Sequence, residues 1–504
     1  MITTKNSLQL FKELDEKITH LSTVAALVGW DQKVMAPKKG RMLFSKAASA
    51  LETEIFKLMV SEEMGALIKE LASPDSMSSL DEVTRARVRE RKQYYEKSKA
   101  IPAELYQEYS VLINEANHIW EEARANNDFD HYLPYLERII EMKRKFAEIV
   151  GYSGHPYNAL LDEFESGLTV EMLDPLFAEL RKVSVDLLKK IQNSPNKTPE
   201  EIFEQSYCTE KQKEFNQYLL PIIGFDMEAG RLDETVHPFA QSMNTGDVRI
   251  TTRYLENNVR SAIFGTIHEA GHGIYDQNIN LEYEGTVLRN GASFGIHESQ
   301  SRFLENMVGR SLEFWKYFFP TLQTYFPEQL KNISVEEFYR AINTVKPSLI
   351  RVEADELTYN LHIMIRYEIE KGLISGELKA KDLPSIWNKK MEDYLGITPK
   401  TDSEGVLQDV HWSFGGLGYF PSYTLGNLYS AQILNTIQQE IPNFYQTLEN
   451  GQFDVVNDWL HTNIHQYGSL LSPNELIVKV TGEELNAKYL ADYLTNKYSE
   501  IYGL

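Results

Sequence analysis

The chain has 504 residues, of which 42% are hydrophobic and 25% are charged, and its formal net charge is −22. This balance is typical of globular proteins and excludes collagen-like, low-complexity and fully disordered chains. Because so acidic a chain has no general attraction to phosphate backbones or anionic membranes, we expect neither nucleic acid nor membrane as a partner.

Cys208 is the single cysteine, which excludes an intramolecular disulfide and a cysteine-rich zinc module and fits a reducing compartment. The N-terminal residues Met1–Asn6 contain no basic segment followed by an apolar run. No apolar stretch approaches the ~20 residues that span a bilayer. We therefore expect no signal peptide and a soluble, cytoplasmic protein.

Most of the chain has the three- and four-residue spacing of apolar side chains that predicts amphipathic helices. The pattern begins at Ser7 and returns at 105–125, 132–150 and 172–191. Thr198-Pro199-Glu200-Glu201 has the residues of a capping box with proline at the first helical position, which predicts the start of another helix. No break between these patterns is long enough to be an inter-domain linker.

The segment Asp247–Tyr254 departs from the helical spacing. It is rich in β-branched residues, and Val248, Ile250 and Thr252 would share one face of an extended chain. A short strand is predicted here, so the fold class is mainly α with one small β-sheet. As an edge strand it could pair with the backbone of a peptide. Alternatively, it belongs to a purely structural hairpin.

The residues His268-Glu269-Ala270-Gly271-His272 form an H-E-x-x-H motif. On a helix its two histidines lie one turn apart on the same face, where neutral imidazoles can bind one Zn²⁺ ion. Glu269 would take a proton from water and return it to the leaving amine. The alternative is two histidines that only pack on an amphipathic helix. Gly271 and Gly273 argue against it, because glycine is costly inside a helix and often marks close approach of another backbone.

A catalytic zinc ion needs a third protein ligand. Asp276 lies too far along the same helix to converge with His268, so this ligand should come from a second helix. Glu298, 26 residues after His272, is the best candidate. The alternative for Glu298 is an exposed ion pair with Arg302 at i+4. Judged by distance alone, three other carboxylates remain open: Glu282, Glu284 and Glu305.

Taken together, the motifs resemble the carboxypeptidase Taq family of metallocarboxypeptidases. The resemblance covers essentially the whole chain in order, and five separated motifs together make it highly specific. They are Asp247-x-Arg249-x-Thr251, His268–His272, His297-Glu298-Ser299-Gln300, Ile350-Arg351-x-x-Ala354-Asp355 and Gly405-x-x-Gln408-Asp409-x-His411-Trp412.

The resemblance implies one catalytic domain over residues 1–504, with a mostly helical, neurolysin-like fold in which two halves flank a deep groove. It implies Zn²⁺, for which Co²⁺ can substitute, bound by His268, His272 and Glu298. It implies Glu269 as general base and acid. It also implies that single residues are released from the free C-termini of peptides with broad preference, and that the protein is commonly a homodimer.

A carboxypeptidase must also hold the α-carboxylate of its substrate, and the planar guanidinium of arginine suits this task. The residues alone leave five candidates open: Arg249, Arg253, Arg289, Arg302 and Arg351. The resemblance favours Arg351, whose alternative is an i,i+4 salt bridge to Asp355.

The resemblance also suggests other substrate-binding residues, namely His411, Tyr423, Asp247, Arg249 and Gln300. A positioned His411 could stabilise an oxyanion, or it could simply pack beside Trp412. Two other functions remain open. One is a zinc endopeptidase that cuts internal bonds of short peptides, and the other is a helical scaffold with an inert metal site.

Overall fold

The computed structural model describes residues 4–504. The chain divides into two compact units. Unit 1 comprises Met1–Lys99, Glu200–Ile342 and Ile433–Glu484, and unit 2 comprises Ala100–Pro199, Asn343–Gln432 and Leu485–Leu504. Residues 1–3, in the segment where no signal peptide is expected, lie outside the described residues. The prediction of one catalytic domain built around a groove stays a prediction.

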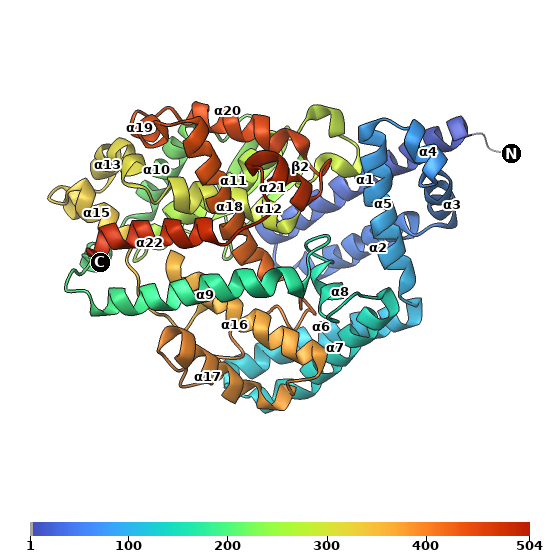
Figure 1. Ribbon diagram of the computed structural model, residues 1–504, viewed down its shortest axis with the longest axis horizontal. Helices are drawn as coiled ribbons and strands as arrows, with labels where there is room; N and C mark the ends of the chain where they lie inside the picture. Colours follow the sequence, from blue (N-terminus) through green and yellow to red (C-terminus); the bar gives the residue numbers. More distant parts are fainter. Residues whose placement is uncertain (1–3) are drawn as a thin grey trace. The chain divides into compact units, whose positions relative to one another are not determined.

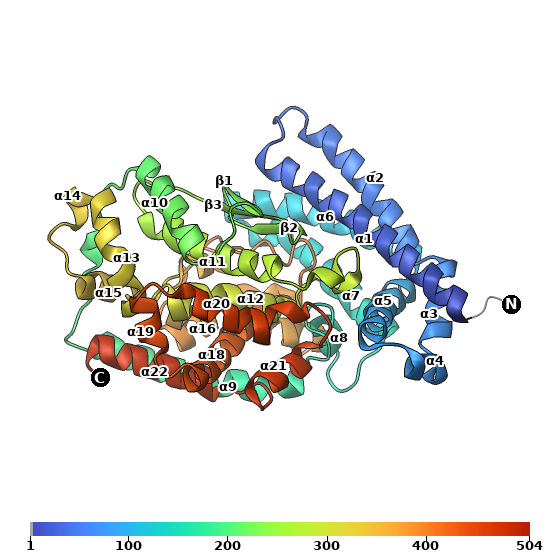
Figure 2. The ribbon, with the colours of Figure 1, turned by 90° about the horizontal axis from the view of Figure 1, so that it is seen from above.

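The N-terminal part of unit 1 is a helical layer. Helix α1 (Thr4–Val34) packs along α2 (Arg41–Met59) and α3 (Glu62–Leu71), as Figure 2 shows. Apolar side chains at helical spacing, such as Phe11 and Ile18, are fully buried there. The other helices of unit 1 are α4 (Pro74–Ser79), α5 (Glu82–Ala100), α10 (Thr209–Ile222), α11 (Val259–Gln277), α12 (Phe294–Arg302), α13 (Leu312–Tyr325), α14 (Pro327–Leu330), α15 (Val335–Ile342), α19 (Phe444–Glu449), α20 (Phe453–Asn463) and α21 (Pro473–Thr481).

Unit 1 also contains a three-stranded sheet, made of β1 (Gly230–Glu234), β2 (Ala240–Asn244) and β3 (Asp247–Thr252). The strand order is β1-β3-β2, with β1 parallel and β2 antiparallel to β3. The sheet packs against α11 (Figure 2), and Val248 and Ile250 are buried. The predicted strand is confirmed. Its prediction as an edge strand is wrong, because β3 is hydrogen-bonded on both sides and cannot pair with a peptide.

Unit 2 consists of helices and loops. Its longest helices are α6 (Ala103–Asn126), α7 (Phe129–Val150), α9 (Val170–Asn193) and α16 (Glu356–Ser375), with α22 (Lys488–Tyr502) packed along α9 (Figure 1). The remaining helices are α8 (Asn158–Leu161), α17 (Leu383–Leu395) and α18 (Pro421–Glu440), whose last turns belong to unit 1. Nearly every residue of α16 is buried, so this helix forms the centre of the unit.

The predicted class, mainly α with one small sheet, is confirmed. The helix predicted to begin at 198–201 is wrong, because Glu200–Phe203 makes only a single 3-10 turn and the next α-helix begins at Thr209. Pro199 and the two glutamates therefore start a turn that is not continued. Within residues 4–504, no helix is long and apolar enough to cross a bilayer.

Candidate metal centre and active site

Helix α11 carries the H-E-x-x-H motif. Asn258 caps its first turn by accepting a hydrogen bond from the backbone N–H of Ser261. The apolar residues of the helix are buried, which fixes its rotation within unit 1. His268 and His272 consequently lie on one face, with ring centroids 5.1 Å apart.

Two glycines of α11 allow other parts of the chain to approach closely. A Cβ atom at Gly271 would lie 2.6 Å from the carbonyl oxygen of Gln300 and 2.6 Å from the Cα of Ser301, so α12 crosses α11 directly at this residue. At Gly273 a Cβ atom would meet the ring of Phe225 at 2.6 Å. The crossing at Gly271, between the two histidines, brings Glu298 of α12 to the face of α11 that carries them.

The three predicted ligands converge. Glu298 Oε2 lies 3.6 Å from His268 Nε2 and 3.3 Å from His272 Nε2, and one ligand atom from each residue lies within 4.8 Å of the others. The Nδ1 atoms of both rings are engaged elsewhere: that of His268 donates to Glu305 at 3.0 Å, and that of His272 lies 2.7 Å from His297 Nδ1. Two imidazole nitrogens and one carboxylate oxygen aimed at one point fit a divalent ion such as Zn²⁺.

Glu298 is fixed in this orientation from outside the ligand set. Arg302 donates to Glu298 Oε1 at 2.7 Å and Ser301 donates to Oε2 at 3.1 Å. Burial alone raises the pKa of Glu298, but Arg302 and the two histidines lower it well below its usual range. The i+4 pair with Arg302 therefore exists, although Glu298 is buried, and it leaves Oε2 turned towards the imidazoles.

The other carboxylates considered for the third ligand lie elsewhere. Glu284 accepts a hydrogen bond from the backbone N–H of Thr245, and Glu282 is exposed. Glu305 lies behind His268 in the π-helical segment η4 (Phe303–Val308) that continues α12.

Burial lowers the pKa of His272 to about 4, so that ring is neutral and able to bind a metal ion.

Glu269 differs from every other carboxylate of the centre. The residue is 7% exposed, and its carboxyl group has no hydrogen-bond partner within residues 4–504. Burial raises its pKa to about 7, more than the neighbouring His268 lowers it. A carboxyl group with a pKa near neutrality and free oxygens can both accept and release a proton.

The predicted substrate-binding residues of unit 1 make mostly internal bonds. Arg249 forms a two-pronged ion pair with Asp247, with both N···O distances at 2.7 Å, and lies over the ring of Trp30. Gln300 is 3% exposed, accepts from His465 Nε2 at 3.0 Å and donates to Ser299. Their roles in binding substrate stay predictions.

Unit 2 contains a second buried cluster, centred on Asp409. Arg351 donates through Nε and Nη2 to Asp409 Oδ1, at 3.0 and 2.8 Å, and Arg366 donates through Nε to Oδ2 at 2.7 Å. Gln408 Oε1 accepts from the backbone of Arg351 and from Arg366. Burial raises the pKa of Asp409, but the two arginines lower it well below its usual range.

The salt bridge between Arg351 and Asp355, considered as the alternative role of Arg351, is absent among the described residues. Asp355 instead caps α16 by accepting from the backbone N–H groups of Leu357 and Thr358. Arg366, which shares Asp409, was not predicted from the sequence. A signal for it did exist, since Arg366 and Glu370 lie one turn apart in a helix whose residues are mostly apolar.

His411 and Tyr423 are brought together, with His411 Nε2 3.3 Å from the Tyr423 hydroxyl. Burial lowers the pKa of His411 to about 3, so the ring is neutral. The loop that carries it is held by Glu370, which accepts from Trp412 Nε1 at 2.7 Å, from the Gly418 backbone at 2.8 Å and from the Tyr157 hydroxyl.

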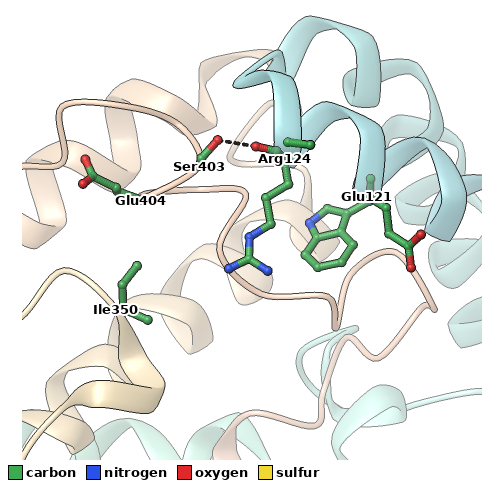
Figure 3. Close-up of a pocket in the computed structure, with 7 residues that line it drawn as sticks. Glu121, Arg124, Ile350, Ser403 and Glu404 are labelled. Carbon is green, nitrogen blue, oxygen red and sulfur yellow. Dashed lines mark hydrogen bonds between the residues drawn. The ribbon is translucent and has the colours of Figure 1, made fainter. Parts of the chain in front are cut away.

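A separate pocket of unit 2, drawn in Figure 3, borders the same loop. Ser403 donates to the backbone carbonyl of Arg124 there, and Trp120 Nε1 donates to the carbonyl of Leu407. The pocket contains none of the predicted site residues, although Ile350 on its wall precedes Arg351. These bonds fasten the loop to α6.

Comparison with known proteins gives a consistent result. Residues 10–498 match the family model described as carboxypeptidase Taq (M32) metallopeptidase. The chain is 49% identical to carboxypeptidase 1 of Bacillus subtilis over 98% of each chain, and 42% identical to thermostable carboxypeptidase 1 of Thermus thermophilus over 100% of each. Its structure is similar to the crystal structure of an M32 carboxypeptidase from Deinococcus radiodurans, with a TM-score of 0.95, 36% identity and coverage of 99% and 100% of the two chains.

Proposed function

The chain belongs to the carboxypeptidase Taq (M32) family of metallopeptidases, which are peptide hydrolases, and we propose that it releases single residues with broad preference from the free C-termini of peptides in a zinc-dependent reaction. The observation that carries the proposal is the convergence of His268, His272 and Glu298 beside the free carboxyl group of Glu269.

In the proposed site, His268, His272 and Glu298 hold Zn²⁺, and Co²⁺ can replace it. When bound, the ion supplies Lewis acidity, which polarises a peptide carbonyl and makes water easier to deprotonate. The donor set supports this assignment, because both histidines present Nε2 and Arg302 keeps one oxygen of Glu298 turned towards them.

Glu269 is the proposed general base and acid. It takes a proton from the attacking water, and it later delivers a proton to the nitrogen of the leaving amino acid. Its raised pKa supports both steps. A nearby cation shifts the group towards its charged form, which is the form that accepts the first proton.

Arg351 is proposed to bind the terminal carboxylate, with His411 and Tyr423 as further substrate-binding groups. Asp409 and Tyr359 take three N–H groups of Arg351, which leaves two of the guanidinium's five for a ligand. Arg253 is the alternative for this task, because it has no carboxylate partner among the described residues and its buried Nε is unpaired.

The test is a mass-spectrometric time course on two identical peptides, one with a free C-terminus and one amidated. Each is incubated with zinc, with cobalt and with a chelator. We expect a ladder of one-residue steps from the free peptide only, lost with the chelator. Internal cleavage of both peptides would favour the endopeptidase, and bound metal without any cleavage would favour the inert scaffold.

A second set of variants identifies the arginine that binds the carboxylate. R351Q and R253Q are compared by the ratio of kcat/KM for the free peptide to that for the amidated peptide. Only the variant that lacks the binding residue should lose this preference, because an amidated end gives arginine no carboxylate to recognise. If both variants keep the preference of the unmodified protein for the free peptide, neither arginine binds the carboxylate.

We also propose a cytoplasmic location and a homodimer. The location is supported by the single, exposed cysteine Cys208 and the dimer by the family resemblance. Light scattering of the purified protein tests the homodimer, because it gives the mass of either one chain or two.

A further inference from the structure

His272 is attached to the rest of unit 1 through two successive polar contacts. Its Nδ1 lies 2.7 Å from His297 Nδ1, and the opposite nitrogen of that second ring, Nε2, lies 3.2 Å from Asp276 Oδ1. Asp276 comes one turn after His272 on α11, and His297 directly precedes Glu298 on α12. The chain His272–His297–Asp276 therefore joins the two helices that supply the metal ligands.

The positions of the protons in this chain follow from the ligand role of His272. If Nε2 of His272 is to offer its lone pair, the ring's single proton must lie on Nδ1, which then donates to His297 Nδ1. His297 Nδ1 must therefore be unprotonated, and its own proton lies on Nε2, where the carboxylate of Asp276 accepts it. One arrangement of protons satisfies all three residues.

The opposite arrangement would prevent metal binding. If His297 carried its proton on Nδ1, that nitrogen would donate to His272 Nδ1 and drive the proton of His272 onto Nε2, where a ligand lone pair is needed. Because Asp276 accepts on the Nε2 side of His297, it favours the neutral tautomer with the proton on Nε2 over the one with the proton on Nδ1. The carboxylate of Asp276 thus influences the tautomer of His272 through the ring of His297.

The two metal-binding histidines differ in this respect. His268 donates directly to the carboxylate of Glu305, which Arg302 and Arg310 hold in turn. A carboxylate accepts at either oxygen and enforces one tautomer by itself. The Nδ1 atom of His272 instead faces the imidazole of His297. A neutral imidazole can donate or accept, so the tautomer of His272 depends on a further residue.

From these contacts we infer that His297 and Asp276 are positioning residues that hold His272 in the tautomer able to bind metal. The inference rests on the proposed function, because it takes His272 to be a ligand. It also assigns a role to Asp276, which lies on the ligand face of α11 but too far along it to bind the same ion as His268.

Packing is the competing explanation for His297. Its ring lies 5.0 Å from that of Tyr275, and a Cβ atom at Gly291 would come within 2.9 Å of it. His465 provides a matched control, because it is also a buried histidine and its ring lies 5.1 Å from that of Tyr275, on which it makes a similar contact. It bonds to Gln300 and to no metal ligand.

The experiment measures the zinc dissociation constant of the full chain by competition with a chromophoric chelator, together with the thermal unfolding midpoint of the zinc-free protein. For H297F we expect zinc binding about 10- to 100-fold weaker. For H465F, which removes a similar ring, we expect a change below about threefold. If H297F does not fold, D276L carries the test, with about tenfold weaker binding expected.

A further pair of variants separates hydrogen bonding from charge. D276N keeps an oxygen that accepts from His297 Nε2, so it should bind zinc more tightly than D276L. Zinc binding by H297F and D276L within threefold of the unmodified protein would overturn the inference, as would an equal loss in H465F. An unmodified protein that binds no zinc would instead overturn the proposed metal site itself.

Discussion

Two buried glutamates, one in each unit, have the same raised pKa in opposite surroundings. Burial raises the pKa of Glu269 in unit 1 and of Glu370 in unit 2 to about 7. Glu370 accepts hydrogen bonds from Trp412, Gly418 and Tyr157, whereas Glu269 has no such partner within residues 4–504. A raised pKa therefore does not by itself identify a catalytic group. The free oxygens of Glu269 distinguish it.

The charged clusters of the two units, the candidate metal centre in unit 1 and the Asp409 cluster in unit 2, also differ in how far their polar groups are paired. In unit 1, two Nε2 atoms and one carboxylate oxygen face a common point, and the excess of carboxylates favours a cation there. In unit 2, both oxygens of Asp409 are bonded to arginines, so its charge is already matched. The donor atoms of the first cluster suit a cation, whereas Asp409 is already paired with two cations and Arg351 keeps two N–H groups for an anion.

The largest difference is expected when each glutamate is replaced by glutamine. E269Q should reduce kcat by about 10³- to 10⁴-fold, because it removes the group that transfers both protons. E370Q should stay within about tenfold of the unmodified protein, because its amide oxygen still accepts from one side of the loop and Glu370 has no part in the metal centre. Steady-state kinetics at equal zinc content compare the two, and similar losses would refute the contrast between them.

Replacing Asp409 tests whether its two ion pairs stabilise unit 2 independently of the metal centre. D409A should lower the free energy of unfolding by about 3–5 kcal/mol, because it leaves two buried guanidinium groups without a carboxylate. Urea denaturation followed by circular dichroism measures the change. The loss should be the same with and without a chelator, and a dependence on metal would show that the clusters are not independent.

Removal of metal tests the opposite property in unit 1. At zinc concentrations 100 to 1,000 times the dissociation constant, bound zinc stabilises the fold by about 2.7–4.1 kcal/mol. A chelator should remove this contribution. Hydrogen exchange should then accelerate in α11 and α12 but not in α16, which has no part in the metal centre. Uniform acceleration across both units would contradict the comparison.

A smaller effect is expected at the crossing of α11 and α12. G271A should destabilise the protein by roughly 1–3 kcal/mol and weaken zinc binding, because the new methyl group displaces the backbone that carries Glu298. Gly29, inside α1 with no heavy atom within 4 Å of its Cβ position, is the control. G29A should stabilise by roughly 0.4–1 kcal/mol. Thermal unfolding of both variants decides the matter.

The most gradual effect concerns pH. The pKa of Glu370 is about 7 in the folded protein against 4.5 for a free side chain, so between these values the folded state retains a proton that the unfolded state has lost. Its contribution therefore decreases as pH rises from about 4.5 to 7, by at most about 1.4 kcal/mol per pH unit. Subtracting the pH profile of E370Q from that of the unmodified protein should isolate this slope. A difference that rises with pH would contradict it.

Much of this protein's secondary structure can be predicted from local sequence patterns. Helical spacing predicted the α-rich class, and the β-branched run at 247–254 predicted β3, because both patterns reflect the geometry of a few consecutive residues. The spacing of His268 and His272 places two candidate ligands on one face of a helix. The expectation of a returning helix favours Glu298 over the other carboxylates, and α12 is that helix.

Contacts between distant segments were decided only by the tertiary structure. Arg351 pairs with Asp409, 58 residues away, instead of with Asp355 one turn along the chain. β3 became the central strand because β1 and β2 pair with it from both sides. His297 and Asp276 meet because α11 and α12 cross at Gly271. Periodicity and i,i+4 spacing describe only the neighbours of a residue along its own helix or strand. The partner that a buried charge finally meets depends on which helices pack together. The sequence by itself determined the types of the candidate ligands, and the tertiary structure determined which residues hold them in place.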